Sequence, residues 1–377
     1  MDIGLVNSHL VYPRGGERQV CKLAYYLNKM GNDVTIYTYE KTNPYFFDDE
    51  LKNIDIIMLN KKAELSTLYE FGINLPRWYY MNKKLNSLIK DHEILNYHNH
   101  PSQWVSHFND IPSIWTCNEP SYYYFSGFSG IKGKLINKPA NLAIKFDDYM
   151  TNVDLIFALD SKMKEAVENR YSNRDVKVVG SGAELERNVI HIQNDYYDII
   201  CVGPIQDQRH TLDIVNAVSL LKDEIRKNIR IYLVGKVMSK EVYENIQKVS
   251  HENSIEIIFY ESISNEELYD LYDIADLSIF VPELQPWGIF PLETILAGIP
   301  TIISDACGIT DIMTKDYLSN FIVTTGDIVS LSNKIEEMIE NEEFFINKTV
   351  KMSNLIKKDY SWESYSKRIF KEFSEII

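Results

Sequence analysis

The sequence predicts an α/β protein with two doubly wound domains, each built on a parallel sheet with helices on both faces. Short apolar runs of strand type alternate with segments of helical periodicity along the chain, and this alternation is typical of successive βαβ units. At 377 residues the chain exceeds what one hydrophobic core usually serves and suits two. The alternation restarts after a polar stretch from Arg187 to Asp195, which we interpret as the linker.

The first domain opens with a strand over Asp2 to Ser8 and a helix over Gly16 to Met30. The helix carries apolar residues at helical spacing and stops at Gly31, a residue suited to the left-handed cap of a helix. A second strand follows at Val34 to Thr38. Short apolar runs predict further strands at Ile54–Leu59, Ile94–Tyr97, Ile111–Thr116, Leu155–Leu159 and Val176–Val179.

The second domain restarts with a strand over Tyr197 to Val202 that ends at Gly203. Its remaining strands are predicted at Ile231–Val234, Ile255–Phe259, Leu277–Val281, Ile299–Ile303 and Asn320–Val323, and helices at Leu212–Leu221, Asn265–Ala275 and Ile289–Ala297. Three polar helices close the chain, and the last of them begins near Trp362.

The most informative segment is the strand, turn and helix around Gly288. Pro291 fixes the start of the helix, because proline lacks an N–H and is accommodated only in the first turn. The amides of Gly288, Ile289 and Phe290 then lack partners inside the helix, and such amides at the positive end of a helix dipole suit a phosphate. Glu293, one turn later, has a carboxylate that can accept two hydrogen bonds from a vicinal diol such as ribose. The segment predicts a nucleotide site, although an ordinary βαβ crossover with a solvated glutamate has the same spacing.

A second glycine-containing turn joins the first strand to the first helix. Gly15 and Gly16 stand at the predicted N-terminus of that helix, where residues without a side chain let the backbone approach a ligand. A Gly-Gly pair is also common in plain turns, so both interpretations stay open on the residues alone.

Composition narrows the function. A formal net charge of −15 argues against a non-specific nucleic-acid binder, which needs a basic face. No apolar run approaches the roughly 18 residues of a membrane span, and the chain opens directly into a strand rather than a signal peptide, so we expect a cytoplasmic protein. The four cysteines are scattered singly and predict buried free thiols rather than metal ligands. The sequence has no Asp-x-Asp motif, so we expect a site without a metal or another cofactor.

The segment from Gln285 to Pro300 resembles the signature of the retaining glycosyltransferases of family 4, the glycosyl transferases group 1. In that signature two glutamates separated by seven residues flank a Pro-aromatic-Gly turn, and a Gly-x-Pro follows. Here the second glutamate is Glu293, the turn ends at Gly288, and Gly298 begins the Gly-x-Pro. The resemblance implies the GT-B fold, two Rossmann-like domains facing across a crevice. It implies an acceptor domain over residues 1–186, a nucleotide-sugar domain over 187–358, and a terminal helix over 359–377 that crosses back to the first domain.

The family pattern assigns donor-side roles to several residues. Gly16 matches the second glycine of a Pro-x-Gly-Gly-x-Glu element, which faces the donor diphosphate and the acceptor. In the family, an arginine and a lysine after the first strand of the second domain stabilise the charge that grows on the leaving diphosphate. Here the arginine position is Pro204 and the lysine position is Arg209. The first glutamate is replaced by Gln285, which could still position the donor sugar, and Glu283 could substitute for it.

Three residues that follow strands of the first domain complete the predicted site. His98 stands where the family often has a histidine near the acceptor, as a general base or as a hydrogen-bonding wall residue. Asn118, in a Cys-Asn-Glu-Pro element of one branch of the family, replaces a histidine near the donor sugar. Its amide cannot shuttle protons but can hydrogen-bond a sugar hydroxyl. Glu119 is the nearest acid and is predicted on the acceptor side with Gly15.

The resemblance implies a metal-independent, retaining hexosyltransferase that moves a sugar from a nucleoside diphosphate sugar to a glycan or lipid-linked acceptor. The residues predicted as catalytic are Asn118, His98, Gln285 and Arg209, and those predicted to bind the donor are Gly16, Arg209, Gln285, Gly288, Ile289, Phe290 and Glu293. Two alternatives stay open. The departures at Gln285, Asn118 and Pro204 also fit a non-catalytic homologue that acts as a partner subunit, and a sugar-nucleotide epimerase could use the same fold.

Two stretches of the first domain combine aromatic residues with cations and contain no acidic residue. They run from Arg77 to Lys90 and from Tyr122 to Lys145. Such stretches suit a membrane interface or an anionic lipid-linked acceptor, which would place the protein at the inner face of the membrane. They fit equally a solvated face on which lysines extend their stems along apolar surface.

Overall fold

The chain forms two compact units. The structure is a computed structural model that describes residues 1–11, 14–59, 75–119, 142–171, 174–311 and 319–377. Unit 1 comprises Met1–Gly182 with Trp362–Ile377, and unit 2 comprises Ala183–Ser361. The boundaries predicted after residues 186 and 358 lie within a few residues of these divisions.

Unit 1 is built on a seven-stranded parallel sheet in the order β3-β2-β1-β4-β5-β6-β7. Strands β4, β5 and β6 are buried along their whole length, as expected for a parallel sheet covered on both faces. The elements of unit 1, with a further helix over residues 142–150, are β1 Asp2–Asn7, α1 Gly15–Lys29, β2 Asp33–Thr38, α2 Asp48–Leu51, β3 Asp55–Met58, α3 Leu75–Asn86, β4 Ile94–His98, the 3₁₀ helix Ser102–Phe108, β5 Ser113–Cys117, β6 Leu155–Ala158, α6 Ser161–Arg170, β7 Asp175–Val178 and α15 Trp362–Ile376.

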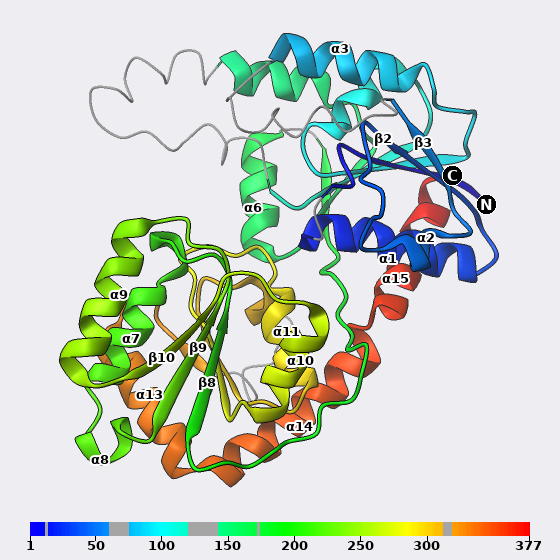
Figure 1. The fold of residues 1–377 in the computed structure, drawn as a ribbon. Helices are drawn as coiled ribbons and strands as arrows, with labels where there is room; N and C mark the ends of the chain where they lie inside the picture. The colour runs from blue at the N-terminus through cyan, green and yellow to red at the C-terminus, as the bar shows by residue number, and fades with distance from the viewer. Residues whose placement is uncertain (12–13, 60–74, 120–141, 172–173, 312–318) are drawn as a thin grey trace. The chain divides into compact units, whose positions relative to one another are not determined.

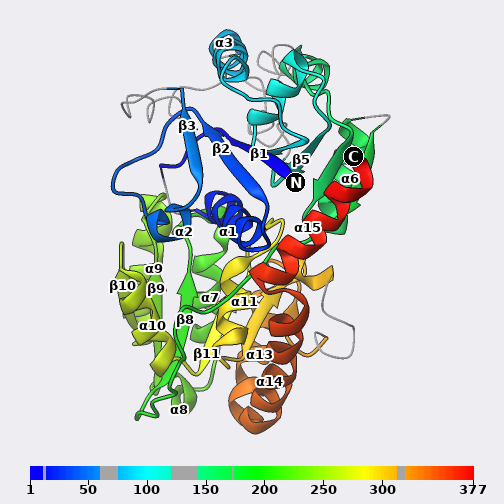
Figure 2. The same ribbon diagram turned by 90° about the vertical axis from the view of Figure 1, so that its right-hand side faces the viewer.

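The terminal helix α15 belongs to unit 1 and packs against α1 (Figure 2). Trp362, at its start, is fully buried and occupies the space next to Gly182. A Cβ atom on Gly182 would lie 2.5 Å from Cε3 of this indole, so only glycine permits the contact. Further along the helix, Arg368 Nε donates to the Val179 carbonyl at 3.3 Å. These contacts attach the end of the chain to the end of the sheet of unit 1.

Unit 2 is built on a six-stranded parallel sheet in the order β10-β9-β8-β11-β12-β13. Figure 1 shows α7 and α9 on one side of strands β8 to β10 and α10 and α11 on the other. The elements of unit 2 are β8 Tyr197–Val202, the 3₁₀ helix Asp207–Arg209, α7 Thr211–Ser219, α8 Asp223–Arg226, β9 Ile229–Val234, α9 Lys240–Asn253, β10 Glu256–Tyr260, α10 Asn265–Ile274, β11 Leu277–Phe280, α11 Ile289–Leu296, β12 Thr301–Ser304, the 3₁₀ helix Gly308–Asp311, β13 Ile322–Val323, α13 Ile328–Glu340 and α14 Glu342–Asp359.

Each sheet reverses its strand order at one point. In unit 1 the chain proceeds outward through β2 and β3 and then returns to place β4 on the other side of β1. In unit 2 it proceeds through β9 and β10 and returns to place β11 beside β8. In open α/β sheets ligands bind at the carboxyl ends of the two strands that flank such a reversal. A ligand is therefore expected at the loops after β1 and β4 in unit 1 and at the loops after β8 and β11 in unit 2.

The polar segment predicted as the linker lies in unit 2 and is attached to α10. Arg187 donates to Asp270 at 2.8 Å and to Asp273 at 2.9 Å. The amide of Ile190 donates to the Asp273 carboxylate at 2.7 Å, and the amide of Ile192 donates to the Asp273 carbonyl. One aspartate near the end of α10 thus orders a segment that has no regular secondary structure of its own.

The predicted fold class is confirmed, and each predicted strand is present with ends shifted by a residue or two. The aromatic and lysine-rich stretch predicted from Tyr122 lies outside the described residues up to residue 141. No helix among the described residues is both long enough and apolar enough to cross a membrane.

Candidate functional site

The loop between β11 and α11 is held in place by the segment that follows β12. The carbonyl of Gln285 accepts from the amide of Gly308 at 2.8 Å, and the amide of Gln285 donates to the carbonyl of Ala306 at 3.4 Å. The carbonyl of Trp287 accepts from the amide of Ile309 at 3.1 Å, and the Cys307 thiol donates to the same carbonyl. The loop is therefore braced on one side by a bridge that resembles an extra strand pair.

Gly288 ends this loop in a conformation that requires glycine. Its φ is 106° and its ψ is 79°, and it forms the N-cap of α11. A Cβ atom here would lie 2.9 Å from Cys307 Sγ and 3.1 Å from Pro291 Cγ, so a side chain is excluded by both the backbone conformation and the neighbouring atoms. The predicted turn at Gly288 is thus present, and α11 begins at Ile289 as predicted.

The first turn of α11 presents backbone donors. Among the described residues, the amides of Gly288, Ile289 and Phe290 donate no hydrogen bond to a backbone carbonyl. Pro291 completes the turn without an N–H, so no donor there competes for a ligand. Such amides at the positive end of the helix dipole suit an anion. Their role in binding a phosphate stays a prediction.

Arg209 approaches this loop from the adjacent strand β8. Its Nη1 donates to Gln285 Oε1 at 2.6 Å, and its guanidinium lies 5.9 Å from the centre of the Phe280 ring. The turn that carries it closes at His210, a residue with a φ of 52° whose ring nitrogen lies 2.6 Å from an Asp213 carboxylate oxygen. Arg209, which follows β8, and Gln285, which follows β11, are therefore in direct contact, and both are predicted donor-side residues.

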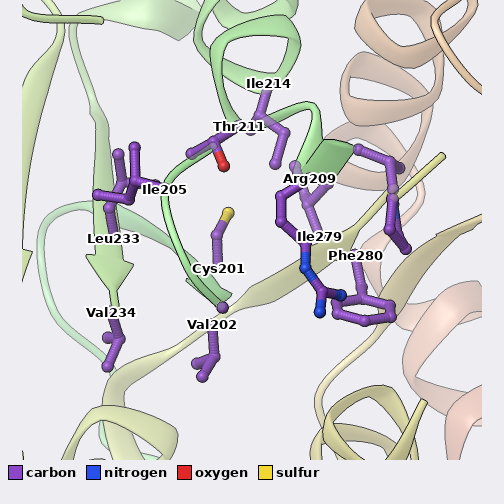
Figure 3. Close-up of a pocket in the computed structure, with 13 residues that line it drawn as sticks. Cys201, Val202, Ile205, Arg209, Thr211, Ile214, Leu233, Val234, Ile279 and Phe280 are labelled. Atoms are coloured by element: carbon purple, nitrogen blue, oxygen red, sulfur yellow. The ribbon is translucent and has the colours of Figure 1, made fainter. Parts of the chain in front are cut away.

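Two hollows in unit 2 differ in what they could hold. Figure 3 shows the smaller one, where Arg209 lies beside the Phe280 ring and the Cys201 thiol and the Thr211 hydroxyl point toward each other. Its volume of about 20 Å³ admits at most a water molecule. The larger, open hollow of about 680 Å³ is lined partly by acids, among them Asp207, Asp213 and Glu283. Three carboxylates repel a diphosphate, whereas the amides at the start of α11 suit one.

Glu293 lies on α11 and is 8% exposed. A glutamate so deeply buried is not the solvated residue of an ordinary crossover, because an ionised carboxylate is rarely buried without partners. Glu283, in contrast, is exposed, and its amide donates to the Gln208 carbonyl at 2.9 Å. The assignment of the ribose to Glu293 stays a prediction.

The loops after β8 and β9 touch each other at two glycines. A Cβ atom on Gly235 would lie 2.1 Å from the Gly203 carbonyl oxygen, and the amide of Gly235 donates to the Tyr260 carbonyl at 2.7 Å. Pro204, the residue at the position of the missing cation, directly follows this contact. The three loops at the carboxyl ends of β8, β9 and β10 therefore form one connected edge.

Unit 1 brings a cluster of amides to its own strand reversal. Asn7 ends β1, Asn99 follows β4, and Asn118 follows β5. Asn99 Nδ2 donates to Asn7 Oδ1 at 2.9 Å, and Asn118 Nδ2 donates to Asn99 Oδ1 at 2.8 Å. Gly16, in the first turn of α1, lies against this pair. Of these residues the sequence predicted Gly16 and Asn118, whereas Asn7 and Asn99 were missed.

His98 ends β4 and is completely buried. Neither ring nitrogen has a hydrogen-bond partner among the described residues, and burial lowers the pKa of the imidazole to about 3. A base with so low a pKa takes up protons poorly near neutral pH, so the ring in this conformation favours the role of a wall residue over that of a general base. Gly15 and Glu119, the other predicted acceptor-side residues, are exposed.

All four cysteines are buried and free, as predicted. No group of three or more His, Cys, Asp or Glu side chains within the described ranges is placed to hold a metal ion.

Two family models match the chain along most of its length. Residues 13–187 match the model described as Glycosyltransferase Family 4. Residues 182–359 match the model described as Glycosyl transferases group 1. The two matches meet at the division between unit 1 and unit 2.

Known proteins with similar sequences or folds agree with these matches. The chain is 21% identical over 380 residues to an uncharacterized glycosyltransferase of Methanocaldococcus jannaschii, covering 94% of this chain and 92% of the relative. It superposes on sucrose-phosphate synthase from Thermosynechococcus elongatus with a TM-score of 0.74 at 15% identity, covering 99% and 98% of the two chains. It superposes on HepE of Anabaena, solved in complex with UDP and glucose, with a TM-score of 0.72 at 12% identity and complete coverage of both chains. These likenesses confirm the predicted GT-B fold.

Proposed function

Because this chain is a glycosyltransferase of the group 1 type, we propose that it transfers a hexose from a nucleoside diphosphate sugar to an acceptor hydroxyl with retention of the anomeric configuration. The bond between the anomeric carbon and the diphosphate oxygen breaks, and a bond from the acceptor oxygen to the same carbon forms on the same face. The proton of the acceptor hydroxyl passes to the leaving phosphate. Negative charge grows on the diphosphate, so groups that stabilise it lower the barrier most.

The observation that carries the proposal is the combination of α11 amides with Arg209. The amides of Gly288, Ile289 and Phe290 begin a helix whose N-cap excludes any side chain. Arg209 reaches Gln285 in the same loop at 2.6 Å. Preorganised backbone donors and a guanidinium fork are both suited to phosphate oxygens. In this proposal they stabilise the leaving diphosphate without a bound metal ion.

The departures from the family at positions 204 and 285 compensate each other in charge. The family pattern has two cations and one glutamate around the diphosphate, a net charge of about +1. Here one cation, Arg209, stands beside the neutral Gln285, and Pro204 adds no charge. The sum is again about +1. A glutamate at position 285 would instead neutralise the single guanidinium that contacts it, so the two departures together keep the net charge of the family pattern.

A charge exchange tests this proposal. In Gln285→Glu the new carboxylate lies close to the diphosphate, and at roughly 5 Å with an effective dielectric constant of about 20 it costs about 3 kcal/mol, or about a hundredfold in kcat/KM. In the double variant Pro204→Arg with Gln285→Glu, which restores the family's charges, we expect activity to recover by at least tenfold over Gln285→Glu alone. A Gln285→Glu variant as active as the wild type would contradict the charge argument.

The donor is proposed to carry uridine diphosphate. HepE of Anabaena, which shares the fold, was solved with UDP and glucose. The direct measurement is the thermal shift of this chain with UDP-, GDP- and ADP-sugars, followed by product analysis with the donor that shifts it most. Turnover that persists in excess EDTA is expected if Arg209 and the amides alone carry the diphosphate charge, and loss of turnover would require a metal ion.

Unit 1 is proposed to supply the acceptor side, with Gly15, His98 and Glu119 near the acceptor and Asn118 near a sugar hydroxyl. Glu119 is exposed, so it is better suited than the buried His98 to receive a hydrogen bond from the acceptor. We expect Glu119→Gln to raise the KM for the acceptor more than that for the donor. Equal increases in the KM values for the acceptor and the donor would show that Glu119 does not contact the acceptor.

Unit 1 is also proposed to contact an anionic lipid surface through α3. This helix buries Trp78, Met81, Asn82 and Leu85 and exposes Arg77, Tyr79, Tyr80, Lys83 and Lys84. Tyr80 is 64% exposed, and α3 contains no acidic residue. Aromatic rings beside lysines suit the headgroup region of an anionic bilayer. Co-sedimentation with vesicles containing phosphatidylglycerol should fall strongly in Lys83→Glu with Lys84→Glu, and should not occur with neutral vesicles.

A non-catalytic homologue and a sugar-nucleotide epimerase are the competing functions. The departure at Asn118 from the family's histidine keeps the first alternative open. A chain that binds a nucleotide sugar but neither hydrolyses nor transfers it would be a non-catalytic homologue. A chain that converts the donor sugar into its epimer without an acceptor would be an epimerase.

A further inference from the structure

Three asparagines at the strand reversal of unit 1 form a continuous chain of hydrogen bonds. It begins at the backbone carbonyl of His9, which accepts from Asn7 Nδ2 at 2.7 Å. Asn7 Oδ1 accepts from Asn99 Nδ2 at 2.9 Å, and Asn99 Oδ1 accepts from Asn118 Nδ2 at 2.8 Å. Each amide therefore donates toward β1, and Asn7 and Asn99 also accept from the side of β5.

The direction of this chain is fixed at one end. A backbone carbonyl can only accept, so the atom of Asn7 that faces His9 must be the NH₂ group, and Oδ1 must face Asn99. Asn99 must then present its NH₂ group to Asn7 and its oxygen to Asn118. Asn118 in turn must present its NH₂ group to Asn99. The orientation of all three amides, which is ambiguous for an isolated asparagine, follows from the single carbonyl of His9.

The middle residue is held by its backbone. Asn99 has a φ of 59°, a left-handed conformation that asparagine adopts more readily than most residues. Its carbonyl accepts from the Ser102 hydroxyl at 2.7 Å and from the Ser102 amide at 3.1 Å. These bonds fix the backbone of Asn99, and its side chain reaches Asn7 on one side and Asn118 on the other.

Gly16 is the residue that leaves room for the chain. A Cβ atom there would lie 2.7 Å from Asn99 Oδ1 and 3.2 Å from Asn118 Nδ2, the two atoms that share a hydrogen bond. The first turn of α1 can therefore close over this bond only with glycine. Glycine at position 16 therefore has a second physical reason besides the close approach of a ligand: a side chain there would collide with Asn99 and Asn118.

One polar atom is left over at the far end. Asn118 Oδ1 is buried and has no hydrogen-bond partner among the described residues. Because Asn118 must turn its NH₂ group toward Asn99, this oxygen cannot exchange places with the nitrogen. The series of hydrogen bonds thus ends in an acceptor without a donor. Burial of such an atom costs free energy until it accepts a hydrogen bond.

We propose that Asn7, Asn99 and Asn118 form a polarity relay that fixes Asn118 Oδ1 as the acceptor for a hydroxyl group of a sugar substrate, with Asn7 and Asn99 as positioning residues. The inference rests on the proposed glycosyl transfer and specifies which substrate group this position takes. A hydroxyl can donate to the oxygen, whereas a phosphate or a carboxylate can only accept and is rejected. The hydroxyl belongs to the donor sugar or to the acceptor.

Substitutions at Asn118 test the polarity. Asn118→Asp has no donor for Asn99 Oδ1, so it sets two oxygens against each other, and we expect kcat/KM to fall at least thirtyfold. Asn118→His is the matched variant, because a neutral imidazole can donate to Asn99 through one nitrogen and accept a hydroxyl through the other. It should retain activity within about fivefold of the wild type. Equal activities of Asn118→Asp and Asn118→His would overturn the relay.

Two assays distinguish the source of the hydroxyl. If it belongs to the donor sugar, Asn118→Ala slows hydrolysis of the donor alone as much as it slows transfer. If it belongs to the acceptor, the variant raises the KM for the acceptor and leaves hydrolysis unchanged. An Asn118→Ala variant with wild-type parameters in both assays would overturn the assignment of a substrate contact.

A readout without turnover separates the relay from the proposed function. In protein labelled with ¹⁵N-asparagine, removal of the anchor in Asn7→Ala should shift the side-chain amide signals of Asn99 and Asn118 together. Asn99→Asp, which replaces the donor to Asn7 Oδ1 by an oxygen, serves if Asn7→Ala fails to fold, and should shift the Asn7 and Asn118 signals. An unchanged Asn118 signal in the folded variant would disprove the relay. If the variants show the coupled shifts but the wild type transfers no sugar, the proposed function would be wrong and the relay would stand.

Discussion

Replacing Gly288 with alanine measures how strictly the anion site at α11 depends on its N-cap. A φ of 106° costs an alanine about 1–2 kcal/mol relative to glycine. The new Cβ would lie 2.9 Å from Cys307 Sγ and 3.1 Å from Pro291 Cγ, and such overpacking adds about 1–3 kcal/mol. We therefore expect Gly288→Ala to lower the free energy of unfolding by about 2–5 kcal/mol, measured by denaturant titration. Relief of the clash should also turn the first amides of the helix and weaken UDP binding by at least tenfold.

Gly298, at the other end of the same helix, supplies the matched control. Its φ is 86°, but no atom lies within 4 Å of the position that a Cβ would take. Gly298→Ala should therefore show the backbone cost alone, about 1–2 kcal/mol, and leave the Kd for UDP unchanged. Equal losses of stability in the two variants, or equal Kd values for UDP, would refute the argument that the surroundings of Gly288 shape the site.

Three further predictions follow from buried residues. Glu293→Gln should weaken UDP binding in calorimetry about tenfold by replacing a charged acceptor of the ribose with a neutral one, and an unchanged Kd would remove Glu293 from the site. The pKa of His98 is lowered from 6.5 to about 3 in the folded chain, so the unfolded chain binds the proton first as pH falls. Between pH 6.5 and about 3 this residue should therefore lower the free energy of unfolding of the wild type by about 1.4 kcal/mol per pH unit. Denaturant titrations of His98→Leu should lack this contribution. In Gly182→Ala the new Cβ would lie 2.5 Å from the Trp362 ring and 2.8 Å from the Trp362 Cα. This variant should destabilise unit 1 by about 2–4 kcal/mol and speed amide exchange in α15. Gly31→Ala, whose Cβ would have no atom within 4 Å, should not affect amide exchange in α15.

The corner around α11 could be predicted from sequence because several local rules agree there. Pro291 restricts where a helix can start, Gly298 marks where it ends, and the flanking apolar runs are too short for helices. Each rule concerns residues a few positions apart. The structure accordingly places α11 at Ile289–Leu296, one residue shorter than predicted at its end.

Other features depend on contacts that no local rule encodes. Helix α9 is an exception, because Val242, Ile246 and Val249 stand at helical spacing and its apolar period could have been found in the sequence. The burial of His98 is a property of the whole sheet around β4, and nothing in its neighbours along the chain indicates it.

The asparagine relay shows the same limit more sharply. Asn7 and Asn99 are 92 positions apart in the chain, and neither matches a motif. The only available signal was that each polar residue follows an apolar strand run, and carboxyl ends of parallel strands meet at one edge. That signal indicates proximity but not the direction of hydrogen bonds, which depends on one carbonyl group of the folded chain.

The two strand reversals carry opposite hydrogen-bonding characters, and this division argues for a division of substrate groups. At the reversal of unit 2 the loop after β11 offers donors, namely the first amides of α11 and the Arg209 guanidinium. At the reversal of unit 1 Asn118 Oδ1 is a buried acceptor without a partner among the described residues, and the ring of the nearby His98 is kept neutral by burial. Phosphates only accept, whereas sugar hydroxyls can donate. A diphosphate therefore suits the donors of unit 2, and a sugar hydroxyl suits the acceptor of unit 1.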